Sequence, residues 1–288
     1  MEYLVKPMLS LLLIACCLPG CHSKDAASGL PLDVNGVPRE YRLFVPTQPP
    51  DGPMPLVVAI HGGSGRDDRY PEQTALEELA EAQGFVVAYP LSELLPGNEG
   101  EWQLNTDSQS RQDLDFIEAL IDELSVQYSI DQERVYASGY SLGSMFTYEL
   151  ACHLSARFAA VASHAGSMPM QPNSCAPEHP LGVMHIHATQ DEIIPYADSW
   201  DWKEWPQVGP MMSIPGLVDY WTAYYNCLSS DQVDSGSSTQ YVRSSCDEGA
   251  RVEHYRLEEG GHEWPVEVAG VPTHEVMWSF WSGFRREG

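Results

Sequence analysis

Residues 134–146, RVYASGYSLGSMF, place one glycine two positions before Ser141 and another two positions after it. The stretch begins with the apolar, β-branched character of a buried strand and continues from Leu142 with helical spacing. At a sharp turn from strand to helix, side chains at these two positions would collide with neighbouring backbone, so Gly139 and Gly143 are required there. The turn lifts the Ser141 hydroxyl above the sheet edge, and Ser141 is the predicted nucleophile.

Strand and helix patterns alternate outward from this turn. The segment 55–62, PLVVAIHG, is so continuously apolar that both of its faces must be covered. The other strand patterns lie at 41–46, 85–90, 134–139, 158–166, 182–189 and 252–257, and helical spacing occupies 71–84, 111–128 and the residues after Leu142. This alternation predicts an α/β fold, a mostly parallel central sheet with helices on both faces.

Composition limits the size of the fold and the kind of partner. The 288 residues, of which 43% are hydrophobic, suit one large domain. Forty-one acidic residues against 15 basic ones give a net charge of −26, and no basic block could follow a phosphate backbone. We therefore expect a solvated anionic surface and no nucleic-acid partner.

The N-terminal residues 1–21 resemble an export signal, because their apolar run is too short to span a membrane comfortably. They end in LPGC, which resembles a bacterial lipoprotein box and predicts lipidation of Cys21 and a membrane anchor; Cys16 closes an earlier, second match. An ordinary secretory signal is the alternative. Residues 22–36 are then expected to form a flexible tether, and residues 37–288 the folded domain.

The four cysteines beyond the leader suit an oxidising compartment. They allow three connectivities, of which local closure favours the pairs Cys152–Cys175 and Cys227–Cys246. A zinc site is the rival interpretation, and it is disfavoured because no CxxC pair or histidine cluster accompanies these cysteines.

A serine nucleophile needs a histidine to take its proton and an acid to orient that histidine. Asp191 follows the strand pattern 182–189 at the sheet edge where such folds present their chemistry, although a turn role before Pro195 is the alternative. His262 lies in the glycine-hinged LEEGGHEWP near the C-terminus. The chain order serine, aspartate, histidine is the one expected of α/β-hydrolases.

The HGGSG segment beginning at His61 follows a predicted central strand, where a loop should supply a second donor to an oxyanion. The first donor is the amide of Leu142, at the start of the helix. Between Gly62 and Gly63 we favour Gly63 for the second, and we expect His61 to be a structural hydrogen-bonding residue.

His185 and His187 alternate on one strand face and could form a metal pair, but the sequence offers them no third ligand nearby. We therefore predict neither a metal nor a cofactor.

Most of residues 40–285 resemble the secreted esterase family that contains feruloyl esterases and polyhydroxybutyrate depolymerases. The shared landmarks are PLVVAIHGGSG, GFVVAYP, the run from DLDFIEAL to SGYSLGSM, LAC followed by FAAVASHAG, HATQDEIIPY, YWTAYYNC and GGHEWP. The resemblance implies an α/β-hydrolase fold in which Ser141, Asp191 and His262 are nucleophile, acid and base. The chain departs from the family where Ser144 replaces a second glycine and where HAT replaces HGT.

Aromatic residues mark a candidate substrate region. The segment YADSWDWKEWPQVGPMMSIP is rich in tryptophan and methionine, which suit a clamp over an aromatic acyl group or a polyester chain. Packing of a lid against the body is the alternative. The candidate substrate-binding residues are Trp200, Trp202 and Trp205, with Trp102 and Trp264 as weaker candidates.

Three functions remain open from the sequence: a serine ester hydrolase, which we favour, a peptidase with the same triad, and a non-catalytic surface binding protein. The chain shows no C-terminal substrate-binding module, so we expect soluble feruloyl or acetyl esters of saccharides as substrates, with polyhydroxybutyrate as the alternative. The sequence leaves the oligomeric state open.

Overall fold

The computed structural model describes residues 29–63, 69–93, 101–106, 111–201 and 208–286 of the chain. Among these residues, no helix combines the length and the apolar character that crossing a membrane requires. Cys16 and Cys21, the two candidate lipidation sites, lie outside the described residues.

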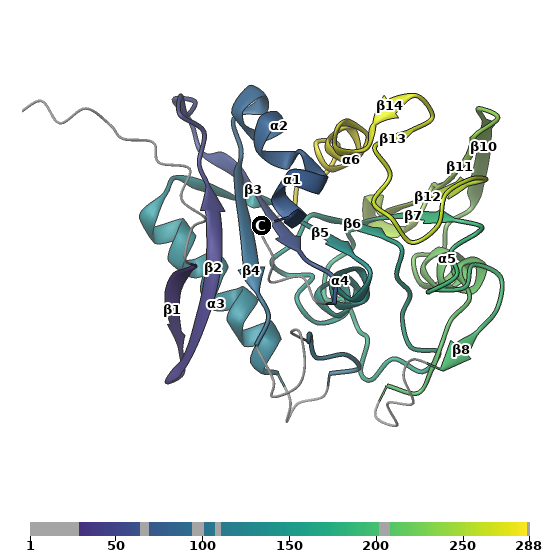
Figure 1. Cartoon of the computed structure of the whole chain (residues 1–288), viewed down its shortest axis with the longest axis horizontal. Helices are drawn as coiled ribbons and strands as arrows, with labels where there is room; N and C mark the ends of the chain where they lie inside the picture. The colour runs from purple at the N-terminus through teal and green to yellow at the C-terminus, as the bar shows by residue number, and fades with distance from the viewer. Residues whose placement is uncertain (1–28, 64–68, 94–100, 107–110, 202–207, 287–288) are drawn as a thin grey trace, which may run out of the picture.

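A ten-stranded sheet organises the described residues, with strand order β1-β2-β4-β3-β5-β6-β7-β12-β11-β10 (Figure 1). Neighbouring strands run parallel from β4 through β12, and the strands at both edges are antiparallel. The strands are Leu30–Val34 (β1), Val37–Phe44 (β2), Met54–Ile60 (β3), Val86–Leu91 (β4), Ile130–Tyr140 (β5), Ala160–His164 (β6), Gly182–Ala188 (β7), Ser229–Asp234 (β10), Ser238–Ser244 (β11) and Arg251–Leu257 (β12).

Helices cover both faces of this sheet, as the sequence predicts (Figure 1). One face carries α3 (Gln112–Gln127), α4 (Leu142–His153) and α5 (Ile214–Tyr224), and the other carries α1 (Arg69–Thr74), α2 (Leu76–Gln83) and α6 (Thr273–Trp281). Two short two-stranded sheets pair β8 (Trp200–Asp201) with β9 (Pro210–Met211), and β13 (Glu267–Val268) with β14 (Val271–Pro272).

The central strand β3 explains the uninterrupted apolar run. Its side chains alternate between the two faces: Leu56, Val58 and Ile60 join the core beneath α3, α4 and α5, whereas Val57 and Ala59 join the core beneath α1, α2 and α6. All five residues are fully buried.

Two glycines allow α4 to approach the sheet closely. A Cβ atom on Gly139 would lie 2.1 Å from the carbonyl oxygen of Gly143, and one on Gly143 would lie 2.3 Å from the carbonyl oxygen of Ile60. Real Cβ atoms do not make such contacts with backbone, so glycine is required at both positions.

The N-terminal edge corrects the expected domain boundary. Residues 22–36 are expected to be a tether, but Leu30–Val34 forms β1 and pairs antiparallel with β2. Asn35 and Gly36, with φ angles of 54° and 83°, form the tight turn between them. Asn-Gly is a strong hairpin signal because both positions need positive φ, so the sequence itself contained the information.

Both expected disulfides are present, Cys152–Cys175 and Cys227–Cys246. The second joins the residues that flank the hairpin of β10 and β11. This hairpin was not predicted, because its strands are polar and Ser-rich. The structure pairs β11 with β12 and so extends the parallel sheet by two antiparallel strands.

The close approach of α4 yields a stability prediction. A Gly143→Ala variant should lower the free energy of unfolding by about 3 kcal/mol, because the added methyl group would displace α4 from β3. The control is Gly52→Ala, where the added Cβ meets no atom within 4 Å, and its change should stay within about 1 kcal/mol. Urea unfolding measures both, and equal changes would contradict this account of the turn.

Candidate active site

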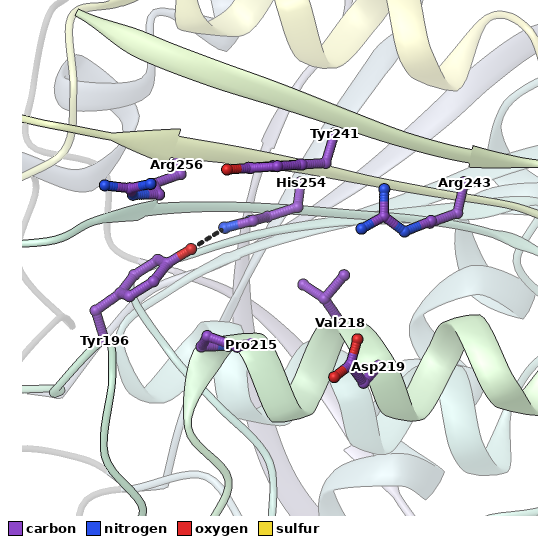
Figure 2. A pocket seen from close by; sticks show the side chains of 8 residues that line it. All are labelled: Tyr196, Pro215, Val218, Asp219, Tyr241, Arg243, His254 and Arg256. Carbon is purple, nitrogen blue, oxygen red and sulfur yellow. Dashed lines mark hydrogen bonds between the residues drawn. The ribbon is translucent and has the colours of Figure 1, made fainter. Parts of the chain in front are cut away.

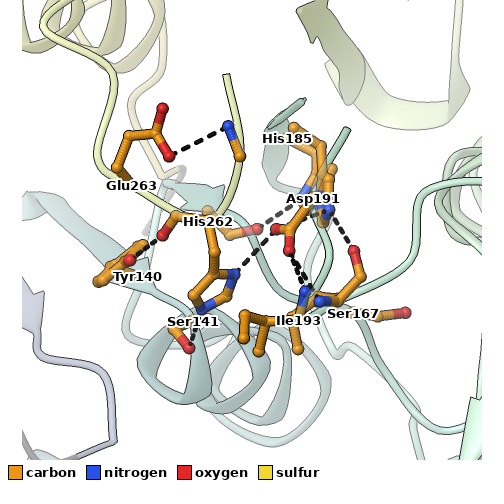
Figure 3. A network of polar contacts seen from close by, with 12 residues as sticks. Tyr140, Ser141, Ser167, His185, Asp191, Ile193, His262 and Glu263 are labelled. Atoms are coloured by element: carbon orange, nitrogen blue, oxygen red, sulfur yellow. Dashed lines mark hydrogen bonds and ion pairs between the residues drawn. The ribbon is translucent and has the colours of Figure 1, made fainter. Parts of the chain in front are cut away.

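Three side chains from distant parts of the chain meet at the carboxyl edge of the parallel strands (Figure 3). Ser141 lies between β5 and α4, Asp191 follows β7, and His262 lies in the loop after β12. The Ser141 Oγ atom is 2.8 Å from His262 Nε2, and His262 Nδ1 is 2.8 Å from Asp191 Oδ2. The structure therefore brings the three sequence-predicted residues into one hydrogen-bonded row.

The Ser141 backbone is held in a conformation that L-residues rarely adopt, with φ 55° and ψ −120°. Its N–H donates to the carbonyl oxygen of His164 over 2.9 Å, and its own carbonyl accepts from the Met145 N–H at the start of α4. These two hydrogen bonds, together with the close packing of Gly143, hold the hydroxyl in place above the sheet edge.

Asp191 is a buried carboxylate surrounded by donors. Its Oδ1 accepts the backbone N–H groups of Ile193 and Ile194, each over 2.8 Å. Its Oδ2 faces His262 Nδ1 at 2.8 Å and His187 Nε2 at 3.4 Å. Burial alone would raise the pKa of Asp191, but the hydrogen bonds from His187, His262 and Ile194 outweigh it and hold the pKa well below its ordinary value.

A chain of buried side chains continues behind Asp191. His187 Nε2 lies 3.0 Å from the Ile194 carbonyl, which only accepts, so this nitrogen carries the proton and Nδ1 is an acceptor. His185 Nε2 then donates to His187 Nδ1 over 3.0 Å, and His185 Nδ1 accepts from Tyr148, whose hydroxyl lies 2.8 Å away. With these proton positions, each O–H or N–H group in the row donates to the next residue in the direction of Asp191.

These hydrogen bonds account for His185 and His187 without a metal pair. The two rings bond to each other rather than converging on a third ligand, and the described residues contain no group of three or more ligating side chains that could hold a metal ion. Sequence analysis missed His187 as a donor to Asp191. Its signal was the position on β7, on the face shared with His185, four residues before Asp191.

The backbone of the His262 loop rests on an aromatic cluster. The hydroxyl of Tyr140 donates to the carbonyl oxygen of His262 (Figure 3). The Tyr140 ring lies 5.5 Å from that of His164, and Trp264 meets both rings edge-on at 6.2 and 5.3 Å. Burial, with the charges of Asp191 and Glu263, raises the pKa of Tyr140 to about 12, so its hydroxyl stays protonated as a donor.

The loop of residues 61–63 lies beside Ser141. A Cβ atom on Gly62 would be 3.1 Å from the Ser141 Cβ, whereas one on Gly63 would meet no atom of the described residues within 4 Å. Both ring nitrogens of His61 form hydrogen bonds to the backbone. Nδ1 donates to the Gly62 carbonyl over 2.7 Å, and Nε2 accepts the Ser92 N–H over 3.1 Å. The loop thus comes closest to Ser141 at Gly62.

Trp102 requires a correction. The sequence suggests it as a substrate-binding residue, but its side chain is buried, its indole N–H donates to the His61 carbonyl over 3.0 Å, and its ring stacks on Phe146 at 5.0 Å. Trp102 thus fastens the 61–63 loop to α4.

The other candidate tryptophans are divided among different environments. Trp264 is buried behind His262 in the aromatic cluster, and Trp200 is half-buried in β8. Trp202 and Trp205 lie outside the described residues. The three described candidates, Trp102, Trp200 and Trp264, therefore lie in three different environments.

Comparison with solved structures identifies the class of fold. The chain aligns with an acetyl xylan esterase from Aspergillus awamori with a TM-score of 0.64 at 17% identity, covering 85% of this chain and 94% of that one. A thermostable esterase aligns with a TM-score of 0.57 at 21% identity, covering 90% of this chain and 63% of that one. The predicted α/β-hydrolase fold is confirmed.

Sequence comparison identifies the family. Residues 39–243 match the family described as Esterase PHB depolymerase, and the chain belongs to this family.

Curated relatives carry esterase names. The chain is 28% identical over 227 residues to the bifunctional acetylxylan esterase/xylanase XynS20E of Neocallimastix patriciarum, covering 79% of this chain and 31% of that protein. It is 30% identical over 259 residues to the putative esterase NocK of Nocardia uniformis subsp. tsuyamanensis, covering 81% and 72%. It is 26% identical over 184 residues to a probable feruloyl esterase C of Aspergillus niger, covering 62% and 63%.

The buried histidines predict how stability changes with pH. Burial lowers the pKa of His164, His185 and His254, in the last case to about 3. Below pH about 6.5 these histidines bind protons in the unfolded chain but not in the folded protein. The free energy of unfolding should therefore be highest above pH 7 and fall as the pH decreases from 6.5 toward 3, by about 1 kcal/mol per pH unit for each histidine.

Urea unfolding between pH 8 and 5 measures this slope, and a His254→Phe variant should reduce it by about 1 kcal/mol per pH unit. Comparison at pH 8, where the rings are neutral in both states, isolates the packing cost of the substitution. An unchanged slope in the variant would contradict the argument.

Proposed function

We propose that this chain is a serine carboxylic-ester hydrolase that acts outside the cytoplasm through an acyl-enzyme. The observation that carries the proposal is the row from Ser141 through His262 to Asp191, with two distances of 2.8 Å. The family and the esterase names of the relatives support it.

In the proposed mechanism His262 acts as the general base. Its Nδ1–H donates to the Asp191 carboxylate, which leaves Nε2 as the acceptor that faces the Ser141 hydroxyl. As Ser141 Oγ attacks the ester carbonyl, its proton passes to Nε2. The buried carboxylate stabilises the resulting imidazolium, and its low pKa keeps it ionised throughout.

The developing negative charge on the carbonyl oxygen needs donors. We assign them to the backbone N–H groups of Leu142, at the start of α4, and Gly63, in the 61–63 loop beside Ser141. Gly62 is the alternative second donor. His61 and Trp102 hold this loop, and their contacts support its preorganisation.

Collapse of the tetrahedral intermediate breaks the bond to the alcohol, which leaves with the proton that His262 had taken. Water then gives a proton to His262 and attacks the acyl-enzyme, and the acid departs as Ser141 regains its hydrogen. The proton balance closes within these residues, the substrate and water.

We propose feruloyl or acetyl esters of saccharides as substrates. The names of the acetylxylan and feruloyl esterase relatives support this class. The description of the family favours polyhydroxybutyrate as a second candidate.

We also propose that the chain is exported and anchored by a lipid on Cys21, or on Cys16. The two disulfides support an oxidising location.

Replacement of the nucleophile tests the mechanism. A Ser141→Ala variant should lower kcat for 4-nitrophenyl acetate by at least about 1,000-fold, because the variant lacks the oxygen on which the proposed acyl-enzyme forms. The control Ser237→Ala changes an exposed hairpin serine and should retain full activity. Undiminished hydrolysis by Ser141→Ala would refute the proposal.

Substrate class is tested by incubating the protein with methyl ferulate, acetylated xylan, a polyhydroxybutyrate suspension and a peptidyl amide, with chromatographic identification of the product. Release of ferulate or acetate is expected. Release of hydroxybutyrate alone would support the second candidate, and faster cleavage of the amide would assign a peptidase.

His187 is proposed as a positioning residue for Asp191. A His187→Leu variant removes the donor 3.4 Å from Asp191 Oδ2 and should lower kcat about tenfold with little change in KM. His187→Gln keeps an N–H donor and should restore most of the activity. Equal losses in both variants, or a loss that appears only in KM, would contradict this role.

A further inference from the structure

A pocket lies between α5 and strands β11 and β12, with a volume of about 280 Å³ (Figure 2). The sheet forms one wall of the pocket and the helix forms the other. The lining residues on which the argument depends are Tyr196, Asp219, Tyr241, Arg243, His254 and Arg256.

Strand register gathers four of these residues on one face. Tyr241 pairs directly with His254 across β11 and β12, Arg243 follows Tyr241 by two positions, and Arg256 follows His254 by two. Because side chains alternate between the faces of a strand, all four point toward α5. Figure 2 shows the arginines at opposite ends of the pocket with Tyr241 and His254 between them.

Hydrogen bonds and ring contacts hold the aromatic part of the pocket. His254 Nδ1 donates to the His185 carbonyl over 3.1 Å, so Nε2 is an acceptor and receives the Tyr196 hydroxyl proton over 2.8 Å. The His254 ring stacks against Tyr241 at 5.9 Å and against Tyr196 at 5.8 Å. A preorganised aromatic surface of this kind suits the apolar face of a sugar ring.

The charge of the pocket opposes that of the whole chain. Only 15 residues are basic against 41 acidic, yet two arginines reach this one pocket. Arg256 pairs with Glu258 at 2.8 Å. Arg243 donates to the Ser230 hydroxyl over 2.6 Å and forms no ion pair with any residue that the structure describes. Its guanidinium can therefore take a carboxylate from a ligand.

The helix side adds an acceptor. Asp219 on α5 faces the pocket, where its carboxylate can accept hydrogen bonds from hydroxyl groups but repels a second anion (Figure 2). The volume is just below the usual range of roughly 300–1,000 Å³ for small-molecule sites, which limits the ligand to about one ring.

We propose that this pocket binds a carboxylate-bearing sugar ring of the uronic acid class. The carboxylate would pair with Arg243, whose guanidinium carbon lies 5.7 Å from the centroid of the Tyr241 ring. The sugar ring would pack against Tyr241 beside this guanidinium, and its hydroxyl groups would donate to Asp219. The identification of the ligand as part of a saccharide substrate rests on the proposed function; the anion site itself does not.

Titration calorimetry at low salt tests the proposal with methyl glucuronide, and methyl glucoside serves as the neutral probe. Saturable binding of the glucuronide is expected, with at least tenfold weaker binding of the glucoside. Arg243→Gln should weaken glucuronide binding about tenfold or more, because a charged hydrogen bond is lost. The control Arg285→Gln changes an arginine that is 57% exposed and should bind as the wild type does.

Tyr241→Ala should weaken binding of the glucuronide but not of sulfate, because only the ring uses the aromatic surface. Three results would overturn the proposal: no saturable binding, an unchanged Kd in Arg243→Gln, or sulfate binding as tightly as the glucuronide. Turnover of 4-nitrophenyl acetate is measured on the same variants and should stay unchanged. If wild-type turnover is absent while the glucuronide binds, the proposed function fails and the pocket assignment stands.

Discussion

The structure depends on how closely the first turn of α4 approaches the backbone of β3 and β5. A Cβ atom on Gly139 would collide with the carbonyl oxygen of Gly143, and a Cβ atom on Gly143 would collide with the carbonyl oxygen of Ile60. This contact forces the chain at Ser141 into a positive φ of 55°, and it thereby turns a buried strand into a helix within one residue. The hydroxyl stands above the sheet because the backbone cannot relax.

Asp191 is the point where the remaining parts of the site meet. Its two oxygens receive donors from its own turn, from β7 and from the loop after β12, so three segments are fixed relative to one another by one carboxylate. Full burial would normally disfavour such a charge, and the donors compensate for it. A row of hydrogen-bonded side chains continues behind it through His187, His185 and Tyr148 to Ser163.

Local rules were enough to predict the parallel sheet and the meeting of Ser141, Asp191 and His262, because buried strands have uninterrupted apolar runs and their carboxyl ends share one edge. The same rules failed where contacts are made across the fold. Nothing near Trp102 in the sequence says that Phe146 and the His61 carbonyl will cover it. The polar strands β10 and β11 show no apolar period, since much of the surface of β10 is exposed. Their place in the sheet is set by the pairing of β11 with β12. Asn35-Gly36, by contrast, was a readable turn signal for β1.

The Cys227–Cys246 bond has a consequence for the geometry of the molecule. Cys227 follows the end of α5 and Cys246 follows the end of β11, so one covalent link joins the two walls that enclose the arginine-lined pocket. The spacing of these walls is thus coupled to the thiol redox state of the surroundings. The other disulfide, Cys152–Cys175, ends on α4, the helix that begins directly after Ser141. Protein produced in a reducing cell interior would lack the covalent link between the helix and the hairpin.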